Sequence, residues 1–207
     1  MTHLTLSGPQ AGGPTRRRLL ATGCAGGLLA LARCGSADPA YYTLAPWPGT
    51  PLPGPAVWVE VHTPSVAAFL DRDNIVREDA GDRLKLAADS AWASPLDQMI
   101  GRALALDLAK RLPGSSVYTQ AGGLQGKPDI VVESDVSRFL RDRDGQAVLE
   151  ATLSVFRHGQ PLRAEPVRLT RVPADQTTGA LVSALSALVG ALADRAARDV
   201  RDLGSAP

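Results

Sequence analysis

DIVVESDVSRFL (Asp129–Leu140) and AVLEATLSVFR (Ala147–Arg157) are the longest strand-like runs in this 207-residue chain. Both are rich in Val and other apolar residues, as strands of a buried sheet are. The six residues between them, RDRDGQ, contain Asp144-Gly145, a pair that suits the tight turn of a hairpin. The sequence therefore predicts two long antiparallel strands.

Shorter strands are expected on both sides of this pair. In Ala56–His62, three valines alternate with Trp58, Glu60 and His62, which predicts a half-buried strand, and Pro64 ends it. A single helical turn is expected at Ser65–Leu70. Asp79-Ala80-Gly81-Asp82 supplies a turn between two extended segments. The remaining expected strands and extended segments are 41–45, Asn74–Glu78, Arg83–Ala87, Val117–Thr119 and Val167–Val172.

Two helices are predicted. Ser94 can act as the N-cap of the first helix, and Pro95 suits its first helical position. An apolar stripe follows at steps of three and four residues, and Pro113-Gly114 ends the helix. The stripe consists of Leu96, Met99, Ile100, Ala103, Leu104 and Leu108. The second helix, about Thr177–Leu203, carries a leucine stripe. The class is therefore α+β, with a largely antiparallel sheet backed by two main helices.

The first 33 residues have the layout of an export signal. Arg16, Arg17 and Arg18 precede a short apolar run of small residues, and the arrangement resembles a twin-arginine leader. In one interpretation Cys34 is the lipidated residue of a lipoprotein. In the other, cleavage follows Ala30-Leu31-Ala32 and releases a soluble protein that begins at Arg33. Removal of the leader takes Cys24 away and leaves Cys34 unpaired, which favours lipidation. Arg33 departs from the small residue that usually precedes a lipidated cysteine.

Three regions follow from this layout. Residues 1–33 are the signal peptide, 34–55 the lipid anchor and tether, and 56–203 a single α+β domain. Without the leader the chain has 18 basic and 21 acidic residues, a net charge of −3. A nucleic-acid-binding surface would show a clustered basic excess, so no nucleic-acid partner is expected.

Signatures of catalysis are weak in the mature sequence. It contains two histidines, His62 and His158, and no cluster with the spacing of a zinc site. No G-x-S-x-G elbow is present to expose a serine nucleophile. The sequence therefore predicts no catalytic residues, no metal and no cofactor. The alternative is a cell-envelope hydrolase that pairs a serine with one of the two histidines.

Three residues are candidate anchors, either of the core or of an interface with a partner. Tyr42 and Leu44 lie in the aromatic segment after the tether, and Trp92 precedes the first helix. Trp and Tyr are common both in cores and at binding hot spots. The sequence alone leaves both roles open.

The order of these motifs resembles the PqiC-type (YmbA-like) family, the ABC-type transport auxiliary lipoproteins. The resemblance rests on Tyr42-Thr43-Leu44 after the cysteine, the valine-alternating strand and the paired strands within Asp129–Phe156. Leu70–Val76 and Ala91–Leu96 add two further short matches. Together the motifs cover roughly residues 34–200.

The resemblance implies a non-enzymatic subunit of an MCE-type lipid transport system. Gly35 after the cysteine points to the outer membrane as the site of the anchor. There the domain would meet a periplasmic MCE-domain protein, and through it a permease and an ATPase. Self-association into a ring around that conduit is compatible with this role, and so is the alternative of a lipoprotein that activates wall synthesis.

Overall fold

A computed structural model describes residues 38–81, 83–120 and 126–204. Within this part of the chain, one sheet of nine strands packs against two helices, which confirms the α+β class. The strands are β1 (Ala40–Tyr42), β2 (Trp58–Val61), β3 (Ser65–Val66), β4 (Asn74–Glu78), β5 (Leu84–Trp92), β6 (Ser116–Thr119), β7 (Ile130–Arg141), β8 (Ala147–Arg157) and β9 (Gln160–Arg171). The helices are α1 (Leu96–Arg111) and α2 (Thr178–Gly204).

Strand β7 is the centre of the sheet. On one side it pairs with β8 over its whole length, and β8 pairs with β9 in the same antiparallel manner. On the other side β7 meets three short parallel partners in turn: β2, β3 and β4. The long ladders are antiparallel, but the sheet as a whole is mixed.

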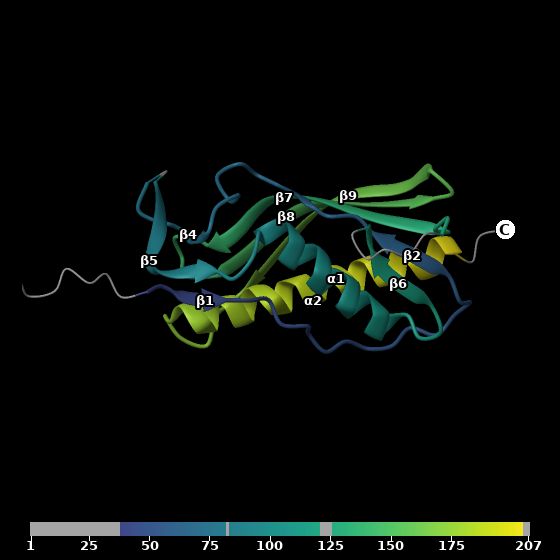
Figure 1. Cartoon of the computed structure of the whole chain (residues 1–207), viewed down its shortest axis with the longest axis horizontal. Helices are drawn as coiled ribbons and strands as arrows, with labels where there is room; N and C mark the ends of the chain where they lie inside the picture. The colour runs from purple at the N-terminus through teal and green to yellow at the C-terminus, as the bar shows by residue number, and fades with distance from the viewer. Residues whose placement is uncertain (1–37, 82, 121–125, 205–207) are drawn as a thin grey trace, which may run out of the picture. The chain divides into compact units, whose positions relative to one another are not determined.

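The outer strands form two groups at opposite ends of β7. β6 pairs with β2 beside Ile130–Val132, whereas β5 pairs with β4 near Arg141, and β1 pairs with β5. Figure 1 shows β1, β4 and β5 at one end of the sheet and β2 and β6 at the other.

Both helices cover the same face of the sheet. α2 contacts β7, β8 and β9, while α1 contacts α2, β2, β3 and β6. Along β8 the side chains of Leu149, Leu153 and Val155 are buried beneath the helices. Thr152 and Ser154 lie on the opposite face and are less buried, so the second face of the sheet is open around these two residues.

The apolar stripe predicted for each helix is buried in the core. The segment Thr178–Asp202 of α2 is long and apolar enough to cross a membrane, but 72% of its most apolar window is buried within the fold. Its position against the sheet and α1 is that of a core helix.

Two local predictions are wrong. Pro95, not Ser94, is the N-cap of α1, and no side chain forms a capping hydrogen bond. Residues 65–66 form strand β3 and not the start of a helical turn, because Ala67 N–H continues the parallel pairing by donating to Val136 O at 2.9 Å.

Candidate functional site

The candidate anchors lie where β1 meets the end of β5. Tyr42 is registered opposite Trp92, and Ala93 N–H donates to the Tyr42 carbonyl at 2.8 Å. Leu44 and Trp92 are buried, with 7% and 5% of their surface exposed, and the Trp92 ring lies 6.2 Å from that of Phe139. Leu44 and Trp92 therefore pack inside the domain, Tyr42 packs partly buried against the core, and Cys34 lies outside the described residues.

The segment after β1, residues 43–55, packs along the seam between α1 and α2; we call it the strap. Figure 1 shows it running beside both helices from the β1 end to the β2 end. Its first contact with α2 is Ala45 N–H, which donates to Ser186 Oγ at 3.2 Å. Leu52 N–H then donates to the Arg111 carbonyl at 2.7 Å. The sequence predicts an anchor and tether over residues 34–55, and in the described structure residues 43–55 of this range pack against the two helices.

Arg111, at the end of α1, holds the middle of the strap. Its side chain is fully buried and donates to Asp194 Oδ1 of α2 at 2.5 Å. The guanidinium also donates to the carbonyls of Trp47 and Pro48, at 3.5 and 3.2 Å. One cation therefore joins α1, α2 and the strap. A guanidinium suits this role because it presents several donors in a rigid plane.

Trp47 is fixed from several directions. The backbone N–H of Trp47 donates to Asp107 Oδ1 at 2.6 Å, and the Arg171 guanidinium lies 5.2 Å from the centre of the indole ring. Its Cβ rests over Gly190 of α2. Burial raises the pKa of Asp107, although the Trp47 N–H and the nearby Arg111 charge act in the opposite direction.

Arg201 closes the far end of the strap. Its guanidinium donates to the carbonyls of Leu52 and Pro55, at 2.9 and 2.5 Å. The strap contains five prolines, which have no backbone N–H to donate. Several of its carbonyls instead accept hydrogen bonds from the side chains of Arg111 and Arg201.

One feature of the sequence indicates this arrangement. Asp107 and Arg111 are spaced i,i+4 and lie among the apolar residues of α1, where two charges need partners. The identity of those partners follows only from the fold, because the strap and α2 are far apart in sequence.

A polar cavity of about 310 Å³ lies on the open face of the sheet, between β2, β7 and β8. His62 lies in its wall, with Nδ1 at 2.9 Å from Glu133 Oε1 and Nε2 at 3.6 Å from Glu60 Oε1. Three serines line the cavity: Ser65 Oγ donates to Asp135 Oδ1 at 2.6 Å, whereas Ser134 and Ser154 form no hydrogen bond to His62 in the described structure. The ring nitrogens of His62 therefore face carboxylates and not a nucleophile.

The other described sites are also unlike catalytic centres. His158 lies in the β8–β9 turn with φ +48°, beside a cavity of about 260 Å³ whose described lining residues include no serine. Another cavity, of about 520 Å³, lies between β2, β6 and α1 and is lined by Val61, Thr63, Asp97, Gln98, Gly101, Arg102 and Thr119. Within the described ranges no three His, Cys, Asp or Glu side chains are placed to hold a metal ion.

These observations define an α+β domain in which the strap, residues 43–55, is hydrogen-bonded to both helices. The chain belongs to the family of ABC-type transport auxiliary lipoprotein components, whose model matches residues 42–197. This confirms the resemblance found in the sequence. It makes the chain a PqiC-like auxiliary lipoprotein, and membership of this family associates it with the cell envelope and with a transport system of several components.

A curated relative and two solved structures are similar to the chain. Intermembrane transport lipoprotein PqiC of Escherichia coli (strain K12) is 26% identical over 148 residues, which cover 71% of this chain and 75% of the relative. A crystal structure of an uncharacterized protein has a TM-score of 0.67 and 22% identity, and covers 79% of this chain and 99% of its own. For a protein from Xanthomonas campestris the TM-score is 0.65 at 16% identity, over 80% and 96% of the two chains. Both structures support the fold.

Proposed function

We propose that this protein is a non-enzymatic outer-membrane lipoprotein that docks a component of an MCE/ABC-type lipid transport system. Acyl chains on Cys34 anchor it, and the folded domain faces the periplasm. Its direct partner is an MCE-domain periplasmic protein, through which it acts with the permease and the ATPase. The family match over residues 42–197 is the observation that carries this proposal.

The short chain between Cys34 and β1 gives the docking role a physical basis. Only residues 35–39 lie between Cys34 and β1, and five residues leave a short reach. Six Cα–Cα steps span at most about 20 Å. The anchor would therefore hold the domain close to the bilayer and not at the end of a long flexible linker.

The contacts of the histidines support a role without catalysis. A general base must reach the proton that it removes, either directly or through one water. His62 contacts two carboxylates, and none of the described residues that line the cavity beside His158 is a serine. Among the described residues no serine hydroxyl is hydrogen-bonded to either histidine, so the hydrolase alternative lacks a serine–histidine pair there.

Binding to the MCE-domain protein tests the proposal. The lipidated protein, in detergent, is expected to retain the purified MCE-domain protein encoded near its gene. Failure of the two purified proteins to associate would contradict the docking role.

The variant Cys34→Ser separates docking from anchoring. It removes the attachment point of the acyl chains, each buried methylene of which contributes about 0.8 kcal/mol of membrane affinity. The variant is expected to move from the membrane to the soluble fraction and still bind the MCE-domain protein. An unmodified wild-type protein in the soluble fraction would contradict the anchor.

A further inference from the structure

The chain enters the domain beside the β4–β5 hairpin. β1 runs parallel to β5, with Ala40 opposite Ser90 and Tyr42 opposite Trp92. Because the strands are parallel, residues 38 and 39 enter β1 from the side of β5 on which the hairpin tip lies. Leu86 and Leu84 lie four and six residues before Ser90, within about 13 and 20 Å along the strand.

This end of the domain exposes apolar side chains. Tyr41, at the point where the chain enters, is 67% exposed, and Leu84 and Leu86 are 46% and 44% exposed. The two leucines are two residues apart on β5, so they share one face of the strand. Together with the partly buried Phe69, Leu84 lines a cavity of about 330 Å³.

Charges in the hairpin are balanced. Arg83 and Lys85 are largely exposed, and both lie near Asp79, at 3.2 and 3.6 Å. Residues 74–87 contain three basic and three acidic side chains in all. A partner of this surface therefore has to be recognised by its apolar and interfacial character and not by its net charge. A phospholipid interface has this character, and Tyr is a residue that favours it.

We propose that the β4–β5 hairpin is a membrane-contacting element, in which Leu84 and Leu86 enter the interface of the bilayer that holds the Cys34 acyl chains. The inference rests on the lipidation in the proposed function. It combines three observations: the short chain between Cys34 and β1, the parallel entry beside β5, and the exposed apolar residues at that end. It adds an orientation, with the β1–β4–β5 end toward the membrane and the β2–β6 end away from it.

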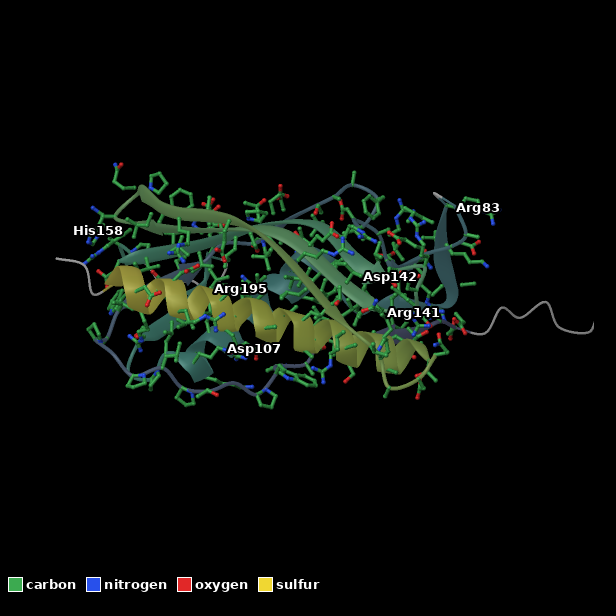
Figure 2. All side chains as sticks on the ribbon, turned by 180° about the vertical axis from the view of Figure 1, so that it is seen from behind. Arg83, Asp107, Arg141, Asp142, His158 and Arg195 are labelled. Carbon is green, nitrogen blue, oxygen red and sulfur yellow. The ribbon has the colours of Figure 1, made fainter. Side chains whose placement is uncertain are left out.

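Site-specific labels test this orientation. The processed full-length protein is placed in phosphatidylethanolamine–phosphatidylcholine vesicles, with Leu84→Cys carrying an environment-sensitive fluorophore. The matched control is Leu162→Cys in β9, also exposed, near the β8–β9 turn at the other end of β7. Figure 2 shows Arg83 of the hairpin and His158 of that turn at opposite ends of the described domain.

The emission of the label at position 84 is expected to shift to the blue when the protein is bound to vesicles. Its intensity is expected to fall when the vesicles contain quencher lipids. The label at 162 is expected to show neither change. The blue shift should persist at high salt, because the contact is apolar. Equal responses at both positions, no response at position 84, or loss of the response in salt would overturn the inference.

Vesicle flotation distinguishes failure of the lipid anchor from failure of the membrane contact at the hairpin. Protein that floats without a response at position 84 retains its anchor and refutes the membrane contact alone. Protein that does not float refutes the anchor, and with it the inference that depends on it.

Discussion

Gly190 shows how the absence of one side chain allows the strap to lie on α2. A Cβ at this position would lie 2.6 Å from Trp47 Cβ, closer than carbon atoms approach in real structures. In an isolated helix Gly costs about 1 kcal/mol relative to Ala. Close packing of the strap supplies a physical reason for glycine at this point.

Replacing Gly190 by Ala should therefore lower stability. Helix propensity alone would raise the free energy of unfolding by about 1 kcal/mol. The clash with Trp47 must displace the strap, which costs typically about 1–3 kcal/mol for an overpacked site. We expect a net loss, measured by urea unfolding.

Gly179→Ala is the matched control on the same helix. A Cβ there would meet Tyr42 at 3.9 Å, an ordinary contact distance. This variant should be neutral or slightly more stable. If Gly190→Ala also gained stability, the strap would not lie on α2 as described.

The local sequence pattern predicted the bounds of a strand well where its pairing partner is close in sequence. The bounds of β8 match the prediction, and those of β7 differ by one residue at each end, because a turn at Asp144-Gly145 sets their register. The apolar stripes located both helices. β9 extends seven residues beyond the N-terminal bound predicted at Val167, since an edge strand with prolines and exposed arginines lacks an apolar pattern.

Elements with distant partners could not be predicted in the same way. β3 is two residues long and exists through its pairing with β7, some seventy positions further along the chain. The strap likewise has no pattern of its own, and its order depends on Arg111 and Arg201. For the candidate site, the sequence proposed Tyr42, Leu44 and Trp92 as anchors of a core or an interface. It did not single out Arg111 and Arg201, whose side chains bind the carbonyls of the strap.

Asp199 joins α2 to β9 and gives a pH dependence of known sign. Its Oδ1 accepts from Arg163 at 2.6 Å. Burial raises the pKa of Asp199; Arg163 opposes this effect, and the nearby Glu165 and Asp202 add to it. Because the folded pKa exceeds the ordinary value near 3.8, the folded state takes up this proton first as the pH falls.

The contribution of Asp199 to the free energy of unfolding should therefore increase as the pH is lowered from 7 toward the ordinary pKa of an aspartate. Asp199→Asn cannot take up the proton, so wild-type stability should increase relative to the variant as the pH is lowered from 7 to 4. Asp107, whose pKa burial also raises, is present in both proteins and cancels in the difference. Urea unfolding at several pH values measures the slope; a difference that falls over this range would contradict the assignment.

At the scale of the whole described domain, the strap connects the β1 end to the β2 end along the helices. Its contacts follow α2 in order, from Ser186 through Gly190 to Arg201. Arg111, at the end of α1, bonds both Asp194 of α2 and the strap carbonyls of Trp47 and Pro48. If the anchor acts as proposed, a load on the N-terminus is passed to the helices at these points, and not to β1 alone.

Arg111→Met should free the strap while the sheet stays folded. The change removes the ion pair with Asp194, which is partly solvated, and the bonds to the carbonyls of Trp47 and Pro48. We expect a local cost of about 2–4 kcal/mol. Since about 1.4 kcal/mol corresponds to a tenfold change, amides of residues 43–55 should exchange with solvent more than tenfold faster. Arg102→Met, at an exposed position of the same helix, should leave exchange unchanged. Uniformly faster exchange throughout α1 and α2 would instead make Arg111 a support of the core, with no separate role in holding the strap.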